Sequence, residues 1–471
     1  MMKYMSAFSL SEYEAFIKGK LAVEVPTGFD YDVPVGPLFD FQAACVQWAL
    51  KRGRAALFLD TGLGKTLCQC TWAKLVSEHT GGNVIIAAPL CVAQQTVEEA
   101  AKFGITVKYC RADDQVEPGI TITNYEMLDH FDLESFAGVV LDESSILKSH
   151  TSKTRESIVA AFRRTPYKLS CTATPSPNDY IELGNQADFL GVMSAQEMLA
   201  TFFTHDGGDT SKWRLKGHGK TRFWEWMATW SICIRNPTDL GFDGAAYELP
   251  PLNIIEHTVS GGELLDGQLF ATVAQSLSER RDAKRKSMND RVALAAQIAA
   301  GVDGPVIIWC HLNDESEALA DAIPFALEVT GAMTADEKER RILSFTHGES
   351  RGIVSKASIA GYGLNWQHCD TMIFAGMDDS FEKFYQAVRR CYRFGQTRPV
   401  NVHIITAETE GAVKANIERK QRQANEMAGE MVAHMRAITR RQIEGARSNT
   451  ETYNPTTPMI IPAWLIANAE K

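Results

Sequence analysis

A glycine-containing stretch at residues 57–70, with the sequence LFLDTGLGKTLCQC, has the residue types of a phosphate-binding loop. An apolar run precedes the glycines and a helical pattern follows them, so that backbone N–H groups at the helix start would point at phosphate oxygens. Gly62 and Gly64 allow close backbone approach. Lys65 would neutralise the terminal phosphates of a nucleotide, and the Thr66 hydroxyl would bind magnesium.

A pair of carboxylates ends another apolar run, in the sequence GVVLDESS of residues 138–145. The carboxyl ends of parallel strands meet at one edge of a sheet, where binding crevices form. Asp142 would hold the metal ion through water, and Glu143 would orient and deprotonate an attacking water molecule. Alone, this pair could be exposed turn acids. Together with a Gly-Lys-Thr turn in the same domain it favours nucleotide hydrolysis.

Four arginines crowd the sequence SFEKFYQAVRRCYRFGQTRPV at residues 380–400, namely Arg389, Arg390, Arg393 and Arg398. Arginines at this density beside aromatic residues suit the stabilisation of charge on a transferring phosphoryl group. We expect Arg390 and Arg393 to face the nucleotide as arginine fingers. The alternative is a surface helix with ion pairs.

Short β-branched or apolar runs alternate with helical patterns in two series. This alternation predicts two α/β domains in tandem, each a parallel sheet wrapped by helices. The first series comprises 55–59, 84–88, 120–123, 138–142 and 167–171, and the second comprises 305–309, 326–329, 352–355, 371–374 and 400–405.

The interval between the two series is rich in tryptophan, and Phe223, Met227 and Trp230 repeat there at helical spacing. This spacing predicts a packed helical face rather than a base-stacking platform. After the second series, residues 409–445 contain few helix-breaking residues and predict a long helix. Prolines prevent the last 19 residues from forming one helix.

The composition sets broader limits. The chain has 471 residues, of which 45% are hydrophobic, and this is enough for two or three packed domains. It has neither an apolar run long enough to span a membrane nor the apolar region of a signal peptide, which predicts a cytoplasmic protein that does not enter membranes. The ten cysteines form no CxxC pair and are expected to be reduced thiols. A net charge of -10 confines any nucleic-acid contact to a local basic groove.

Taken in order from residue 39 to about 409, the motifs resemble those of superfamily II helicase-type ATPases, specifically the Swi/Snf-like branch of double-stranded DNA translocases. The helicase form of the phosphate loop does not require glycine at the position of Leu59. The short chain is similar to forms encoded by bacteriophages and bacteria. The resemblance is carried by LFDFQAACVQWAL, DTGLGKT, AAPLCVAQQTVEEAAKF, ITNYEML, LDESSILKSHTSKT, LSCTATPSPND, VIIWC, SIAGYGLNW and QAVRRCYRFGQTRPV, of which the last two are the most specific.

The resemblance implies an α/β fold with two tandem RecA-like parallel-sheet domains, a helical insertion and a long C-terminal helix. The expected division is an N-terminal segment over 1–35, a first RecA-like domain over 36–189, a helical insertion over 190–250, a second RecA-like domain over 251–408, a C-terminal helix over 409–447 and a proline-containing tail over 448–471.

The same resemblance implies roles for further residues. Gln42 would recognise adenine. Three residues, Thr172, Thr174 and Pro175, would couple the nucleotide state to movement. The phosphates would be contacted by Thr61, Gly62, Leu63, Gly64, Lys65 and Thr66. The nucleotide or the DNA strand would be contacted at the cleft by Gly361, Gly363 and Asn365. The wall of the cleft on the second domain would be completed by Gln386, Arg390 and Arg393.

The implied activity is that of an ATP-dependent motor moving along DNA, expected to be double-stranded, with ATP and magnesium as cofactors. Two alternatives stay open: a strand-separating DNA or RNA helicase, and an ATP-gated nucleic-acid clamp with little hydrolysis. The clamp is motivated by Ser144 and Ser145, which stand where family members carry Ala-His or Gly-His, so that a hydroxyl of Ser145 would have to couple hydrolysis to movement. Arg389 also departs from the acid of many relatives.

Overall fold

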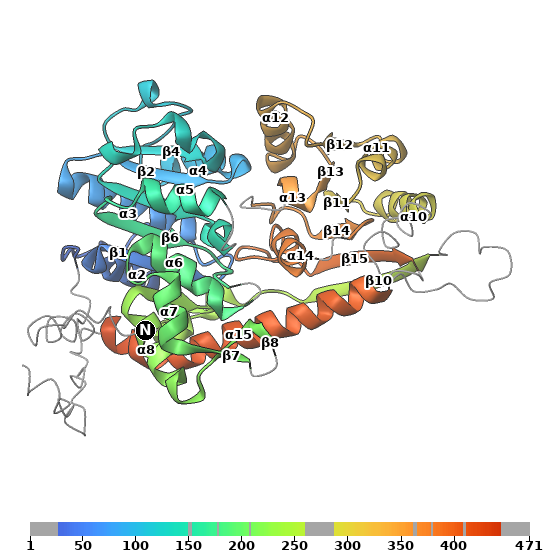
Figure 1. Cartoon of the computed structure of the whole chain (residues 1–471). Helices are drawn as coiled ribbons and strands as arrows, with labels where there is room; N and C mark the ends of the chain where they lie inside the picture. The colour runs from blue at the N-terminus through green and yellow to red at the C-terminus, as the bar shows by residue number, and fades with distance from the viewer. Residues whose placement is uncertain are drawn as a thin grey trace, which may run out of the picture.

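The computed structural model describes residues 27–148, 153–176, 179–206, 209–259, 287–360, 365–377, 380–407 and 411–443. Two parallel sheets with flanking helices form two lobes that lie side by side (Figure 1). The two tandem α/β domains expected from the alternating runs, and the RecA-like fold implied by the family resemblance, are therefore confirmed. Among the described residues, no helix combines the length and the apolar character needed to cross a membrane.

The first lobe is built on a seven-stranded sheet with the order β3-β4-β2-β5-β6-β1-β9, and all its strand pairs are parallel. Its strands are β1 (Arg54–Leu59), β2 (Val84–Ala88), β3 (Val107–Tyr109), β4 (Ile120–Asn124), β5 (Gly138–Asp142), β6 (Tyr167–Cys171) and β9 (Ser231–Ile234). Its helices are α2 (Asp40–Arg52), α3 (Lys65–Thr80), α4 (Leu90–Lys102), α5 (Lys153–Ala161), α6 (Leu183–Leu190), α7 (Ala195–Phe202) and α8 (Lys220–Trp230).

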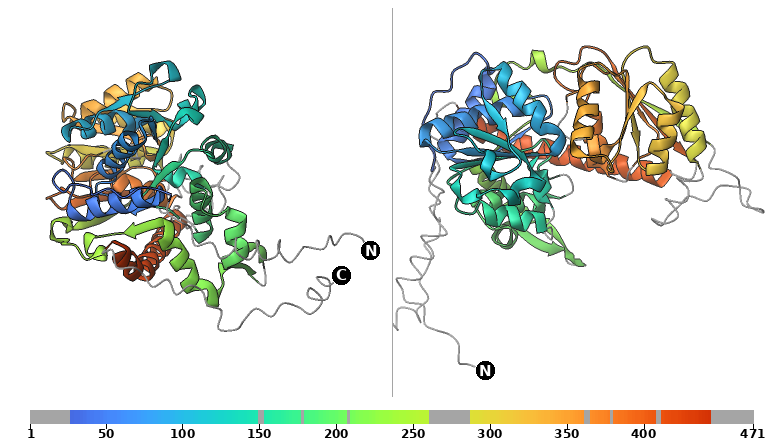
Figure 2. Two further views of the ribbon diagram at one scale, coloured as in Figure 1. Left: turned by 90° about the vertical axis from the view of Figure 1, so that its left-hand side faces the viewer. Right: turned by 90° about the horizontal axis from the view of Figure 1, so that it is seen from above.

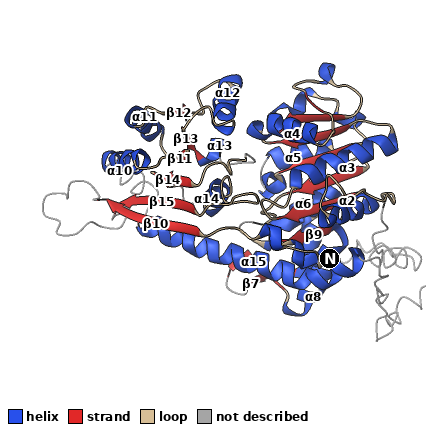
Figure 3. Cartoon of the chain, turned by 180° about the vertical axis from the view of Figure 1, so that it is seen from behind, coloured by secondary structure: helices blue, strands red, loops and turns tan. Residues whose placement is uncertain are grey.

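The second lobe is built on a six-stranded parallel sheet with the order β10-β15-β14-β11-β13-β12. Its strands are β10 (Leu252–Val259), β11 (Val306–Cys310), β12 (Ala326–Val329), β13 (Gly352–Lys356), β14 (Thr371–Phe374) and β15 (Val400–Ala407). Its helices are α10 (Met288–Ala300), α11 (Asn313–Ala322), α12 (Ala335–Thr346), α13 (Ala357–Ala360) and α14 (Phe381–Val388). Figure 3 shows the strands of both sheets from behind.

Segment 190–250 differs from the expected helical insertion. It contains α7 and α8, but also an antiparallel hairpin of β7 (Phe203–Asp206) and β8 (Asp209–Leu215). Its strand β9 pairs with β1 and completes the first sheet. The four residues of β9 follow α8 without a break, so the helical tryptophan pattern concealed them. The predicted packed face is confirmed, because Phe223, Met227 and Trp230 are all fully buried.

The C-terminal helix α15 (Gly411–Ile443) follows β15 in the second lobe and packs against α8, β9 and α2 of the first (Figures 1 and 2). Its 33 residues correspond to a length of about 50 Å. Specific contacts hold its far end: Trp48 Nε1 donates to Gln442 Oε1 at 3.0 Å, and Arg440 Nε donates to the Asp239 carbonyl at 2.9 Å. The helix therefore ties the two lobes together.

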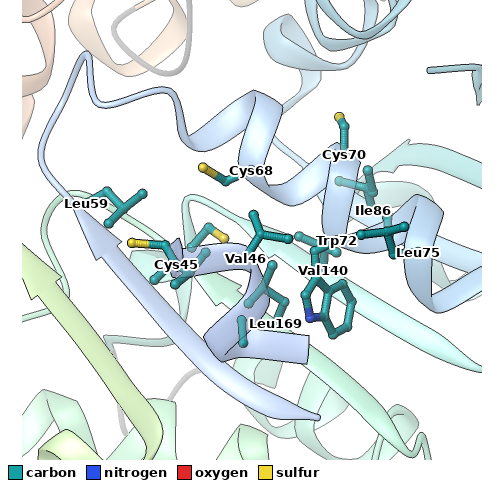
Figure 4. Packing of buried hydrophobic residues seen from close by; sticks show 14 of the residues in the cluster. Cys45, Val46, Leu59, Cys68, Cys70, Trp72, Leu75, Ile86, Val140 and Leu169 are labelled. Atoms are coloured by element: carbon teal, nitrogen blue, oxygen red, sulfur yellow. The ribbon is translucent and has the colours of Figure 1, made fainter. Parts of the chain in front are cut away.

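The apolar layer between the first sheet and helices α2 and α3 supports the phosphate loop from below (Figure 4). Leu59, Cys68 and Trp72 are each fully buried there. Leu59 stands at the end of β1, where its side chain fills the core, so a glycine at this position would leave a cavity.

One buried cation in the first lobe makes its stability depend on pH. Lys168 on β6 is only 2% exposed, and its Nζ donates to the Phe189 carbonyl at 2.8 Å. Burial, with a smaller contribution from Arg54, lowers the pKa of Lys168 from 10.5 to about 8. Between these values the unfolded chain binds more protons than the folded chain, so stability rises with pH in this window.

We predict that Lys168→Met loses this dependence. The difference in unfolding free energy between variant and wild type should fall by up to about 3 kcal/mol between pH 8 and pH 10.5. Urea denaturation at a series of pH values measures it. Lys74→Met is the matched control, because the side chain of Lys74 is 41% exposed. Equal pH slopes for wild type and Lys168→Met would contradict the prediction.

Candidate nucleotide site

The phosphate loop connects β1 to α3 through two glycines in the left-handed region, Gly62 with φ 90° and Gly64 with φ 78°. A Cβ on Gly64 would lie 2.1 Å from Gln42 Nε2, and one on Gly62 would lie 2.6 Å from the backbone nitrogen of Phe394. Both positions therefore need glycine for conformation and for space. The contact with Phe394 brings the second lobe directly against the loop.

Lys65 is the first residue of α3, and its ammonium turns back onto the loop. Its Nζ donates to the Leu59 carbonyl at 2.9 Å and to the Asp60 carbonyl at 3.4 Å. Removal from water lowers the pKa of Lys65, while the nearby carboxylates of Glu143, Asp60 and Asp142 oppose that shift. The ammonium thus lies among acids at the start of a helix, where it can neutralise a phosphate.

The acid pair lies at the carboxyl end of β5, facing the loop. Asp142 is 6% exposed, and burial together with the neighbouring Glu143 raises its pKa to about 7. Glu143 has a φ of 54°, and among the described residues no other non-glycine residue has a positive φ. Tyr125 Oη donates to the Asp142 carbonyl at 2.7 Å and supports this turn. Such a conformation costs free energy and re-aims the Glu143 side chain.

A chain of hydrogen bonds connects the acid pair to the second lobe. Thr172 Oγ1 donates to Glu143 Oε2 at 3.2 Å, and the backbone N–H of Thr174 donates to Thr172 Oγ1 at 3.1 Å. Gln386 Nε2 of the second lobe then reaches Thr174 Oγ1 at 3.4 Å. Ser145 is buried, and the buried hydroxyl of the neighbouring Ser144 has no hydrogen-bond partner among the described residues. Thr172, rather than Ser145, thus contacts the acid.

The two predicted arginine fingers lie across the interface from the acid pair. Arg390 is 2% exposed, and its Nε donates to the Gln386 carbonyl at 2.8 Å. Burial, with repulsion from Arg393, lowers the pKa of Arg390 to about 10, and the charges of Glu143 and Asp142 oppose this shift. Burial also lowers the pKa of Arg393, against the attraction of Glu99 and Glu143. Both guanidinium groups therefore lie within the electrostatic reach of Glu143.

The phosphate loop, the acid pair and the two arginines border one cavity of about 480 Å³ between the lobes, a size suited to a nucleotide. Its lining from the first lobe includes Gln42, Thr61, Gly62, Gly64, Lys65, Thr66, Glu99, Lys102, Asp142 and Glu143. The connector, residues 235–251 between β9 and β10, contributes Tyr247 to the lining. The second lobe contributes Asn365, Gln367, Arg390, Arg393 and Phe394.

The end of the cavity around Gln42 is aromatic. Gln42 uses its amide within the protein: Oε1 accepts from the Phe39 backbone N–H and Nε2 donates to the Leu63 carbonyl, both at 3.0 Å. The side chain of Leu63 is 2% exposed and lies in the core, so this residue can offer only its backbone to a ligand. Tyr247 stacks on Phe394 with ring centroids 4.5 Å apart. These rings provide flat apolar surface of the kind that packs against a base.

Four other predicted residues have different placements. Gln386 is not among the residues that line the described cavity. Its Oε1 accepts a hydrogen bond from Arg390 Nη2 at 3.0 Å, so it holds the arginine from outside the cavity. Asn365 lines the cavity, and its backbone N–H donates to Gln95 Oε1 at 3.2 Å. Gly361 and Gly363 lie outside the described residues.

Sequence reasoning missed Asp60, which precedes the cavity-lining Thr61, and three residues that line the cavity. Asp60 begins the loop and accepts a hydrogen bond from Tyr385 of the second lobe at 2.7 Å. Glu99 and Lys102 lie on the last turn of α4, and Tyr247 lies in the connector. The spacing of charges on α4 could have suggested a polar face, but no local pattern marks Tyr247, because only the fold brings it to the loop.

The donors present fit a magnesium ion. The hydroxyl of Thr66 and the carboxylate of Asp142 border the same cavity and are both hard oxygen ligands. Within the described residues, no group of three or more His, Cys, Asp or Glu side chains could hold a metal ion. Magnesium is usually held by one or two protein ligands together with substrate phosphates and water.

We predict that Thr172→Val lowers kcat for ATP and leaves KM nearly unchanged, because it removes the hydroxyl that orients Glu143. A hydrogen bond to a charged group contributes about 1.5 to 3 kcal/mol, which corresponds to a loss of about 10-fold to 100-fold in rate. Steady-state ATPase kinetics measure it. Thr123→Val is the control, since the buried hydroxyl of Thr123 has no partner among the described residues. Equal losses in both variants would contradict the role of Thr172.

Comparison with known proteins agrees with this geometry. The DEAD/DEAH box helicase family matches residues 39–183, and the helicase conserved C-terminal domain family matches residues 291–395. The chain is 21% identical over 422 residues to the DNA annealing helicase and endonuclease ZRANB3 of Mus musculus, covering 79% of this chain and 38% of that protein.

Two further relatives carry SWI/SNF or helicase names. The SWI/SNF-related matrix-associated actin-dependent regulator of chromatin subfamily A-like protein 1 of Xenopus laevis is 21% identical over 420 residues, covering 79% of this chain and 42% of that protein. The lymphoid-specific helicase of Homo sapiens is 31% identical over 126 residues, covering 26% and 14%. The chain thus spans less than half the length of these relatives. It belongs to the superfamily II helicase-type ATPases, and it is similar to members of their Swi/Snf-like branch.

Proposed function

We propose that this protein is a motor that couples ATP hydrolysis between its two lobes to movement along duplex DNA. The observation that carries the proposal is the single cavity bordered by Lys65 and the acid pair of the first lobe and by Arg390 and Arg393 of the second. A ligand held from both sides favours the closed arrangement of the lobes, and its loss favours opening. Such a cycle can do mechanical work.

The chemical step follows from the residues around the cavity. Magnesium held by Thr66 and Asp142 would neutralise phosphate charge when ATP is bound. Lys65 exchanges the carbonyls of Leu59 and Asp60 for phosphate oxygens. Glu143, oriented by Thr172, accepts a proton from the attacking water molecule. Arg390 and Arg393 stabilise the charge that develops on the transferred phosphoryl group.

Coupling would use the hydrogen-bonded path that begins at Glu143. Thr172 contacts Glu143, Thr174 contacts Thr172, and Gln386 contacts both Thr174 and Arg390. A change in the charge or position of Glu143 would therefore change hydrogen bonds on both sides of the interface. This path argues against the clamp alternative that Ser144 and Ser145 suggest. Thr172, rather than these serines, supplies the hydrogen bond to Glu143.

Duplex tracking would depend on contacts with DNA phosphates, so binding should tolerate sequence and weaken with salt. Support for DNA comes from the relatives, one of which is named a DNA annealing helicase. The net charge of -10 means that the contacts must be local. A strand-separating DNA or RNA helicase remains the competing activity.

We predict that duplex DNA stimulates ATP turnover more than single-stranded DNA or RNA does. Lys65→Ala and Glu143→Gln should each lower the stimulated rate by at least about 100-fold, because each removes a charge or a proton acceptor used in the transition state. A coupled ATPase assay with each nucleic acid measures this. Lys74→Ala, an exposed lysine on the far part of α3, is the control. Equal stimulation by RNA and duplex would count against the branch-specific activity.

A second prediction separates translocation from strand separation. With ATP, the protein should displace the third strand of a triplex without unwinding an unmodified duplex of the same length. Its affinity for duplex should fall linearly on a log-log plot with salt, with a slope of about -0.9 for each phosphate contact. Unwinding of the duplex at a rate similar to triplex displacement would identify a helicase instead.

A further inference from the structure

Asp60, the first residue of the phosphate loop, joins the two lobes through its side chain. Its Oδ1 accepts from the Tyr385 hydroxyl at 2.7 Å, and its Oδ2 lies 3.5 Å from Arg389 Nη2. Tyr385 and Arg389 are one helical turn apart around α14 of the second lobe. The side chains of Asp60 and Arg389 are each 13% exposed, so this ion pair is largely shielded from water and salt.

The groups on the second-lobe side are rigidly held. The Arg389 guanidinium carbon lies over the rings of Tyr385 and Tyr392, at 5.1 and 5.4 Å from their centroids. Stacking of this kind fixes the plane of a guanidinium group and favours charge near an aromatic face. A third cation, Arg235 of the first lobe, has its Nε 4.0 Å from Asp60 Oδ2.

The same aspartate also shapes the loop that holds phosphate. Its Oδ1 accepts from the Thr61 backbone N–H at 2.6 Å, and its carbonyl accepts from Lys65 Nζ at 3.4 Å. Its own N–H donates to the Ile234 carbonyl at 3.0 Å, which anchors the loop to β9. One residue thus contacts the loop, the catalytic lysine and the second lobe.

The position of α14 decides where the arginine fingers lie. Gln386 follows Tyr385 directly, and Arg390 follows Arg389 directly. Arg390 donates to the carbonyl and to the side-chain oxygen of Gln386, so it moves with the helix. A shift of Tyr385 relative to Asp60 would therefore displace Arg390 from the acid pair.

We propose that Asp60 is a positioning residue, a latch that holds Tyr385 and Arg389 so that α14 presents Arg390 and Arg393 to the nucleotide cavity. The proposal rests on the proposed hydrolysis between the lobes. The latch acts through the arginines and does not itself contact the reacting atoms. Formation of the phosphate loop and closure of the second lobe are coupled because both use the Asp60 carboxylate.

The test measures ATPase kinetics of Tyr385→Phe, which removes one hydroxyl, and of Arg389→Gln, which removes the charge. Each should lower DNA-stimulated kcat by about 10-fold or more while KM for ATP changes by less than about 3-fold, because the groups that grip ATP in the first lobe remain. Arg389→Lys should recover part of the loss. The double variant Asp60→Ala with Tyr385→Phe should be no slower than Asp60→Ala alone, because the Tyr385 hydroxyl has already lost its acceptor when the carboxylate is removed.

Arg111→Gln is the matched control. Arg111 of the first lobe pairs with Asp336 of α12 in the second at 2.7 Å, in an exposed ion pair far along the interface from the loop. This variant should keep wild-type kcat within about 2-fold.

The outcomes separate the latch from the proposed function. If wild type hydrolyses ATP and Tyr385→Phe and Arg389→Gln both keep its kcat, the latch is overturned and the proposed function stands. If Arg111→Gln lowers kcat as much as Tyr385→Phe and Arg389→Gln do, any change at the interface has this effect, and the latch is overturned too. If wild type does not hydrolyse ATP with DNA, both ideas fail. Thermal unfolding midpoints for each variant exclude loss of folding as the cause.

Discussion

Opposite charges withdrawn from water into one cavity are the constraint on which this structure depends. Asp142, Glu143 and Arg390 are buried, and Lys65 and Arg393 are half-buried beside them. Burial shifts the pKa values of Asp142, Lys65 and Arg390 each toward the neutral form. Burying these charged side chains together costs free energy unless a ligand of complementary charge is bound. In the proposed function, a polyphosphate with a divalent cation would supply that complement, so that binding and closure of the lobes would favour one another.

The contacts across the interface combine polar pairs with the stacking of Phe394 on Tyr247. They include the Asp60 contacts with Tyr385 and Arg389, the Thr174 contact with Gln386 and the close approach of Gly62 to Phe394. Polar contacts of this kind can be exchanged for contacts with a ligand at little net cost. The helix α15 adds apolar packing to the first lobe through Met431 and Met435, and Met431 borders the same pocket as Asp60 and Tyr385.

Much of this architecture could be predicted from local sequence, and the reasons for the failures are physical. All ten predicted strand runs are strands because buried parallel strands are continuous apolar runs. β9 was missed because four residues adjoining a tryptophan-rich helix carry no period of their own. Lys65 and Asp142 could be proposed from motifs, whereas Tyr385 could not, because its partner lies 325 residues away. Only the folded chain brings such pairs together.

The helix α15 has a consequence for how the molecule is made. Met431 and Met435 belong to the same buried cluster as Phe58, Trp224 and Met227, so the far end of the chain completes the interior of the first lobe. On the ribosome, that lobe emerges long before these methionines are synthesised. Its nascent form must leave the surface around Trp224 and Met227 uncovered while the second lobe is translated. Final consolidation of the N-terminal lobe therefore waits until α15 has been synthesised.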